Sequence, residues 1–79
     1  MTITIIGVKI ENRLENSIEF QKIITKYGCE IRTRIGLHSS NDNVCLNYGI
    51  VLLEVLGEGE LLRCELEKYF QTKIMTFDY

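Results

Sequence analysis

The sequence predicts an α+β protein of the ferredoxin-like kind, a βαββαβ sandwich. Four segments, residues 2–10, 30–38, 44–56 and 72–78, are rich in the β-branched and apolar residues that strands favour. Two segments between them, residues 12–28 and 60–70, instead repeat apolar residues at helical spacing. This order matches the split βαβ plan, whose usual form is a four-stranded antiparallel sheet with two helices on one face. The 79 residues have the length of one such domain, residues 1–79.

The first strand and the first helix are separated by a change of period. Residues 2–10, TITIIGVKI, are mostly β-branched. Asn12 then predicts a helix N-cap, with Glu15 three residues later in a capping-box-like position. Gly28 is expected to end the helix in the left-handed conformation. The inward face of this helix is predicted to consist of Ser17, Phe20, Ile23, Ile24 and Tyr27.

The second and third strands are predicted to form a hairpin. From Glu30 the sequence alternates with a period of two, which indicates one core face and one outer face. A polar cluster at residues 39–43 predicts the turn, and the strand at 44–56 is largely apolar on both faces. The core face is expected to carry Ile31, Thr33, Ile35 and Leu37, and the outer face Arg32, Arg34, Gly36 and His38.

The last helix and strand follow a glycine-containing break at residues 57–60. Acidic residues in this break suit the positive end of a helix dipole. The inward stripe of the helix is predicted to contain Leu62, Leu66, Tyr69 and Phe70, with Leu61 nearby, before TKIMTFD closes the sheet. The aromatic side chains expected in the core are Phe20, Tyr27, Tyr69, Phe70 and Phe77.

Composition argues against several classes of partner. The formal net charge is −2, and no Lys or Arg has a basic neighbour, whereas nucleic-acid binding usually needs a gathered basic excess. The three cysteines are widely spaced, which is typical of reduced thiols in the cytoplasm and not of a disulfide scaffold. The apolar N-terminal stretch is too short to span a bilayer and lacks the features of a signal peptide. We therefore expect a cytoplasmic protein without nucleic-acid or membrane partners.

A symmetric hairpin about Asn41 and Asp42 would bring the outer-face residues together in pairs. His38 would lie opposite Cys45, Gly36 opposite Asn47, Arg34 opposite Gly49 and Arg32 opposite Val51. This outer face, continued by Val51 and Leu53, would combine exposed apolar residues with a polar end. It predicts a buried subunit contact in a homodimer or homotetramer, with a small polar pocket at its edge.

Two sites are possible on that face. Arg32 and Arg34 have the geometry to hold a carboxylate or phosphate, with Gly36, Asn47 and Gly49 around them, or they are solvated or interfacial arginines that pair with Glu across a dimer. His38 and Cys45 suit zinc, nickel or copper if a symmetry mate or Cys29 completes the site, or they are ordinary surface and packing residues. The sequence identifies no cofactor.

Motifs for catalysis are missing from the turn after the first strand. An acylphosphatase-like enzyme would need a glycine-rich phosphate loop there and a copper-chaperone-like carrier would need CxxC, but residues 10–13 read Ile-Glu-Asn-Arg. One histidine also leaves little acid–base chemistry at neutral pH. We expect the protein not to be an enzyme.

The pattern EIRTRIGLH at 30–38, an Asn-rich turn, a long aliphatic strand and a glycine-containing break resembles the small iron-only hydrogenase system regulators. The resemblance covers nearly the whole chain. It implies an ACT-like domain, similar also to the C-terminal domain of nickel-responsive repressors, that oligomerises through its sheet and has a regulatory, ligand-sensing role. It assigns no site residues here, since those repressors use several histidines and ACT domains commonly use a glycine near residues 10–13. The alternative is an interaction domain that assembles through the open sheet face without a ligand.

Overall fold

The elements of the computed structural model follow the predicted βαββαβ order. It describes residues 1–11, 13–41 and 44–79, with side chains for all of these except 13–15, 38–41 and 44–48. The proposed cap of Asn12 and Glu15 therefore lies outside the described residues. The elements are β1 (Thr2–Glu11), α1 (Arg13–Lys26), β2 (Ile31–Asn41), β3 (Val44–Leu56), α2 (Glu60–Glu67) and β4 (Gln71–Asp78).

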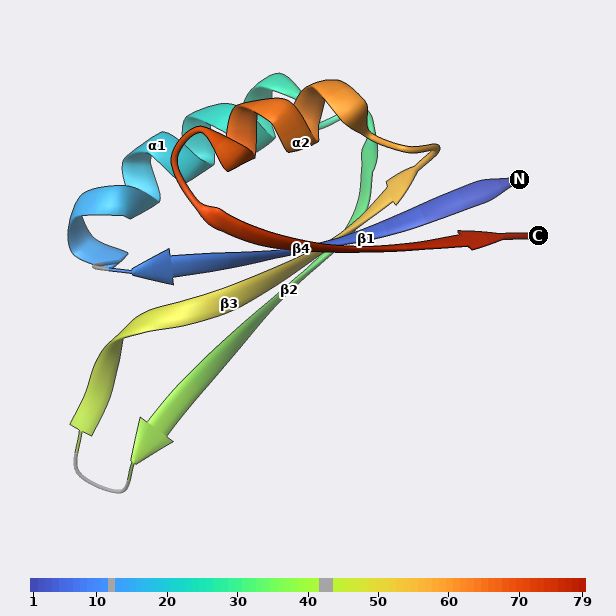
Figure 1. Ribbon diagram of the computed structural model, residues 1–79. Coiled ribbons are helices and arrows are strands. Elements are labelled where there is room, and N and C mark those ends of the chain that lie inside the picture. The colour runs from blue at the N-terminus through green and yellow to red at the C-terminus, as the bar shows by residue number, and fades with distance from the viewer. Residues whose placement is uncertain (12, 42–43) are drawn as a thin grey trace.

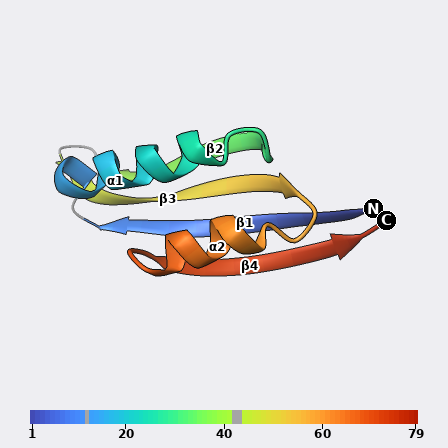
Figure 2. The same ribbon diagram turned by 90° about the horizontal axis from the view of Figure 1, so that it is seen from above.

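The four strands form one antiparallel sheet in the order β2-β3-β1-β4. Both helices cover the same face of this sheet (Figure 1). Seen from above, α1 lies toward the β2 side and α2 toward the β4 side (Figure 2). The ferredoxin-like α+β fold is thus confirmed, and the described residues place no helix over the other face of the sheet.

The core lies between the sheet and the helices. Alternate residues of β1 from Thr4 to Ile10 are buried, and the Thr4 hydroxyl donates to the Gly57 carbonyl at 2.6 Å. The rings of Phe20 and Phe70 meet edge to face at 5.8 Å, which joins α1 to the turn between α2 and β4. The buried apolar side chains are Ile6, Val8, Ile10, Phe20, Ile23, Ile24, Leu53, Val55, Leu62, Leu66 and Phe70.

Two glycines shape the connection from β3 to α2. Gly57 and Gly59 have φ values of +77° and +60°, in the left-handed region that glycine tolerates best. A Cβ on Gly59 would also lie 3.2 Å from Val55 Cγ1, so this turn is packed against the core. The predicted break at residues 57–60 is therefore confirmed.

Several local predictions were wrong. β2 continues to Asn41, so residues 39–41 belong to a strand instead of the turn. α1 ends at Lys26, and Gly28 does not have a positive φ. Ser17, Leu61, Tyr69 and Phe77 are exposed, and Tyr27 is only half-buried, so the core is smaller than the apolar pattern predicted.

The faces of β2 also differ from the prediction. Ile31 pairs with Val55 and packs against the core as expected, but the register shifts between Ile31 and Thr33. This irregularity reverses the alternation, because one extra residue moves every later side chain to the other face. Ile35 and Leu37 consequently point away from the helices and are 50% and 48% exposed.

Candidate functional site

The candidate site is the sheet face opposite the helices. We call it the open face. The pairing registers and the alternation of burial assign to it Ile3, Ile5, Gly7 and Lys9 of β1, Thr33, Ile35 and Leu37 of β2, Ile50, Leu52, Glu54 and Leu56 of β3, and Lys73, Met75 and Phe77 of β4.

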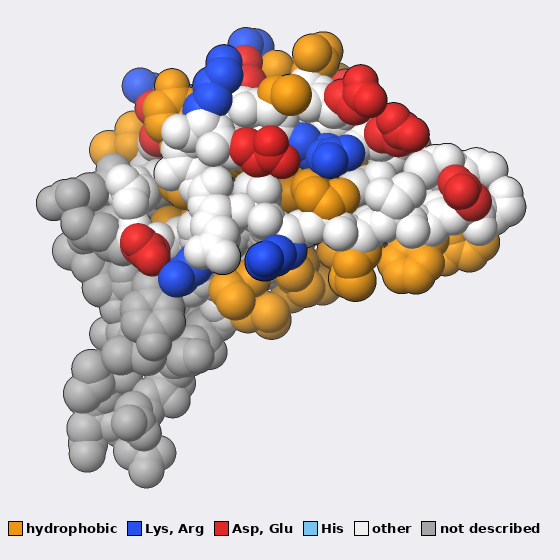
Figure 3. Space-filling view, in the orientation of Figure 1, with side chains coloured by type: hydrophobic (Ala, Val, Ile, Leu, Met, Phe, Trp, Pro, Cys, Tyr) orange, Lys and Arg blue, Asp and Glu red, His pale blue; other side chains and the backbone are white. Residues whose placement is uncertain are grey.

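The open face is predominantly apolar. Six of its large hydrophobic side chains are between 45% and 55% exposed: Ile35, Leu37, Ile50, Leu56, Met75 and Phe77. Each leaves on the order of 100 Å² of its surface open, so together they present about 600 Å², the upper end of what monomers expose. In Figure 3, hydrophobic side chains gather along the underside of the sheet, away from the helices.

A few charged groups of both signs interrupt this apolar surface. Glu54 lies between Thr33 and Ile5 in the sheet register, and the Thr33 hydroxyl donates to its Oε1 at 2.7 Å. Lys9 forms an ion pair with Glu11 at 3.0 Å, and Lys73 is the cross-strand neighbour of Gly7. The described charges of the open face are therefore mixed, and they do not oppose contact with a second surface of the same kind.

Gly7 leaves a shallow hollow near the centre of the open face. It lies between Leu52 of β3 and Lys73 of β4. A Cβ built on Gly7 would meet Leu52 Cδ2 at 3.6 Å and the Lys73 carbonyl oxygen at 3.7 Å, both ordinary contacts. The hollow is therefore the space that a side chain at Gly7 would take, and the side chain of Leu52 borders it.

Arg34, a predicted anion ligand, lies on the helix side of the sheet. Its cross-strand partner is Leu53, not Gly49 as predicted, and Leu53 is fully buried beneath the helices. The guanidinium carbon lies 5.5 Å from the centre of the Phe20 ring. With its amide oxygen turned toward the guanidinium, Gln21 accepts from Nη1 and Nη2 at 3.2 and 3.0 Å. Arg34 therefore attaches α1 to the edge strand β2.

The other predicted ligand residues are not paired as expected either. Gly36 is opposite Val51 and Gly49 is opposite His38, so the predicted partners Asn47 and Arg34 do not face these glycines. Arg32 is exposed and lies at the irregularity between Ile31 and Thr33. The side chain of Asn47 lies outside the described residues. The predicted pairing of this anion pocket is wrong, because it assumed an unbroken, symmetric hairpin.

The predicted strand pairing is also wrong for the proposed metal ligands. His38 pairs with Gly49, and Cys45 pairs with Ser40, with a second register shift between His38 and Ser40. The predicted pairing of His38 with Cys45 is therefore wrong, and both side chains lie outside the described residues. Within the part of the chain that the structure describes, no three His, Cys, Asp or Glu residues gather as a metal site would require. Cys29 and Cys64 are exposed thiols.

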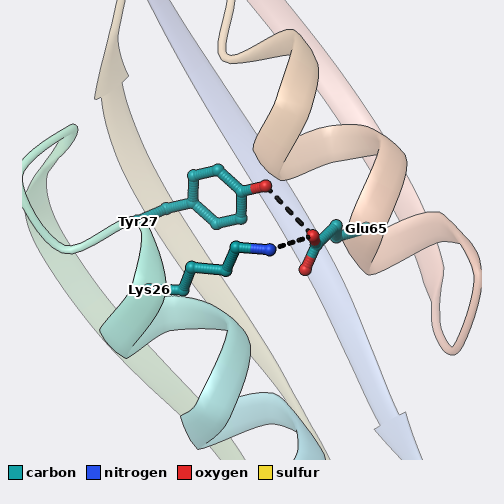
Figure 4. A network of polar contacts seen from close by, with 3 residues as sticks. All are labelled: Lys26, Tyr27 and Glu65. Atoms are coloured by element: carbon teal, nitrogen blue, oxygen red, sulfur yellow. Dashed lines mark hydrogen bonds and ion pairs between the residues drawn. The ribbon is translucent and has the colours of Figure 1, made fainter.

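A polar network joins the two helices on the opposite side of the molecule (Figure 4). Glu65 Oε1 accepts from Lys26 Nζ at 2.7 Å and from the Tyr27 hydroxyl at 3.1 Å. The hydrogen bond with Glu65 raises the pKa of Lys26, and the same bond lowers the pKa of Glu65. Desolvation, followed by the bond to Glu65, raises the pKa of Tyr27. These contacts fix how α1 lies against α2.

The contributions of β1 and β4 to the open face were not predicted. A signal was present in the sequence of β1, because the odd-numbered positions contain Ile3 and Ile5 and the even-numbered positions contain Ile6 and Val8. Because successive side chains of a strand point to opposite faces, apolar residues at both odd and even positions lie on both faces of the sheet.

Comparison with known proteins adds no family assignment. No protein-family model matches the chain, and no curated protein matches it. Neither helix, over its described residues, has the length and apolar character needed to cross a membrane.

Proposed function

We propose that this chain is a non-catalytic interaction domain that assembles with further copies of itself through the open face. The observation that carries the proposal is the apolar surface on the sheet side that no helix covers. A standard protein interface buries about 800 Å² on each partner. The six half-exposed side chains supply most of that area, and the half-buried Ile3, Ile5 and Leu52 extend it.

The small size of the chain supports the same proposal. A domain of about this length buries only ~60–65% of the surface that its unfolded chain exposes. Covering the open face with a second copy would bury apolar residues on both sides of β1 and β3, in a four-layer arrangement of helices, two sheets and helices. Assembly would then contribute directly to folding stability.

A regulatory role is the second candidate, in line with the resemblance to hydrogenase system regulators. The βαββαβ architecture is the one that the resemblance implies. In this role a small ligand or metal would bind at the subunit contact in the cytoplasm and bias how the copies pair. Retained mass on the purified oligomer, lost on denaturation, would favour this role over ligand-free assembly.

The test is the oligomeric state of matched variants. Leu56→Asp places a carboxylate on the open face, whereas Leu61→Asp makes the same change on an exposed position of α2. Burying an unpaired carboxylate costs several kcal/mol, so Leu56→Asp should weaken association at least about 100-fold. Leu61→Asp should leave it unchanged. Val51 is less suitable for this test, because it packs against the core on the helix side.

Native mass spectrometry and sedimentation velocity of the unmodified chain provide the measurement. A dimer or tetramer that only Leu56→Asp dissociates would support assembly through the open face. A monomer at high micromolar concentration, or equal dissociation by both variants, would rule it out.

A further inference from the structure

On the open face a large side chain, Leu52, lies beside Gly7, where the lack of a side chain leaves the shallow hollow, and two copies can be placed so that these two positions meet. Leu52 and Gly7 are cross-strand neighbours on β3 and β1, which are the two central strands of the sheet. A twofold axis that runs along the strands, midway between β3 and β1, exchanges these two strands. It therefore sets Leu52 of one copy above Gly7 of the other, and the reverse.

We infer that two copies stack their open faces about this axis, with Leu52 of each copy filling the hollow over Gly7 of the other. The inference rests on the proposed function and specifies its interface. Among axes along the strands, this one alone lays all four strands of one sheet over all four of the other, β2 over β4 and β3 over β1. The overlap of the apolar side chains is then greatest, so the buried area is greatest.

The rest of the open face is compatible with this arrangement. Rotation about the axis keeps each cross-strand row in place, so Leu56 lies over Ile3 of the other copy. Ile50 lies over Lys9 of the other copy. Lysine side chains cover apolar surface with their methylene stems while the ammonium groups reach water at the rim. Glu54 lies over Ile5 of the other copy, with Lys73 of that copy on the diagonal.

An axis that crosses the strands fits less well. It places every strand over its own counterpart. If this axis passes through the row of cross-strand neighbours that contains Gly7, Lys73 of one copy faces Lys73 of the other, and the two Gly7 hollows face each other. Moved by half a repeat, it places Leu52 over Glu54 or over Ile50 of the other copy, depending on the direction of the shift. The first arrangement brings like charges together, and neither shifted one places Leu52 over Gly7.

The contact between Gly7 and Leu52 of the other copy is the part of this interface whose alignment is best defined by the stacking of the sheets. Stacked sheets lie about 10 Å apart, and their strands cross at about −30°. Residues at the corners of the two sheets are therefore displaced from one another, whereas residues beside the axis near the centre stay aligned. Leu52 and Gly7 occupy those positions. A side chain added at Gly7 would therefore collide with the other copy, and it would do so twice in each dimer.

The experiment measures the dimer dissociation constant by sedimentation equilibrium for four variants. Gly7→Leu should weaken the dimer about 100-fold, because Leu52 of the other copy loses its space. Gly36→Leu is the matched control, since Gly36 pairs with Val51 on the helix side and has nothing within 4 Å of its Cβ position. Leu52→Ala should weaken the dimer about tenfold. The double variant Gly7→Leu/Leu52→Ala exchanges the large side chain and the hollow, and should recover to within about tenfold of the unmodified chain.

Each outcome has a distinct meaning. A monomeric unmodified chain removes both the proposed function and this inference. A dimer that tolerates Gly7→Leu, or that the double variant does not restore, overturns the inference and leaves assembly through the open face standing. As a measurement without substitution, isotope-filtered NMR of a mixture of labelled and unlabelled chains should show contacts between Leu52 methyls and Gly7 Hα of different copies. Their absence in a stable dimer would also overturn it.

Discussion

Neighbouring leucines in β3 should respond very differently to truncation. Leu53 is fully buried under the helices, whereas Leu52 lies on the open face. Truncating a buried leucine to alanine costs about 3 kcal/mol, since both the transfer of its methyl groups and the cavity contribute. Leu52→Ala loses only part of that contact and no enclosed space, so about 1 kcal/mol is expected for the monomer.

These losses are large enough to measure. A domain of 79 residues has a free energy of unfolding of about 4–12 kcal/mol. Each kcal/mol lowers the melting temperature of such a domain by about 4–8 °C, so Leu53→Ala should lower it by about 12–24 °C and Leu52→Ala by less than about 8 °C.

The assay is thermal and urea unfolding, followed by circular dichroism, of both variants in a Leu56→Asp background. That background removes subunit association, which would otherwise make the stability depend on protein concentration. Equal losses at the two positions, or a larger loss at Leu52, would show that the faces of β3 are assigned the wrong way round. The open face and the proposals built on it would then be wrong as well.

Two further predictions concern the helix contact and the β3–α2 connection. Glu65→Gln should flatten the pH dependence of stability, because the lowered pKa of Glu65 gives stability that is present above pH 4.5 and lost as the pH falls through its folded pKa. The raised pKa of Lys26 gives stability that is present below pH 10.5 and lost as the pH rises through its folded pKa. Urea unfolding at a series of pH values between 3 and 11 measures both effects. If the variant and the unmodified chain lost stability equally at acidic and at basic pH, the contact would be unimportant. Gly59→Ala should destabilise the fold more than Gly57→Ala, since both strain a left-handed φ but only the first places a Cβ 3.2 Å from Val55 Cγ1. Equal melting temperatures for the two alanine variants would contradict this packing.

The order of the elements and the extent of β3 could be predicted because they depend on local patterns. The bounds of β3 match the predicted 44–56, where a polar turn and two glycines mark both ends. The change from period two to helical spacing located both helices. Such signals act within a few residues, so one sequence is enough to find them.

The faces of the sheet could not be predicted in the same way. β3 has apolar residues at both its odd and its even positions, so its own sequence does not show which of Leu52 and Leu53 faces the helices. β2 does alternate, but the register shift after Ile31 reverses the alternation, and such a shift depends on pairing with Val55 and Glu54. The predicted pairing of the anion-pocket residues relied on that alternation and is wrong for the same reason.

Residue type also did not separate the core from the open face. Phe77 and Phe70 are equally apolar, yet Phe70 is buried against Phe20 and Phe77 is half-exposed beside Ile3. An apolar side chain indicates burial by some partner, and the sequence does not say whether that partner is a helix of the same chain. Only the pairing of the strands resolves this.

The adjacency of Met1 and Tyr79 has a consequence for how the fold responds to force. The amino group of Met1 donates to the Tyr79 carbonyl at 2.8 Å, and Thr2 donates to Asp78 at 2.7 Å, so β1 and β4 meet at one end of their ladder. Tension applied through handles at these two residues would pull antiparallel neighbours apart from that end. The hydrogen bonds would then break one pair after another, as in a zipper, instead of sharing the load in shear. The domain should therefore yield at low force along this direction, however stable it is to heat.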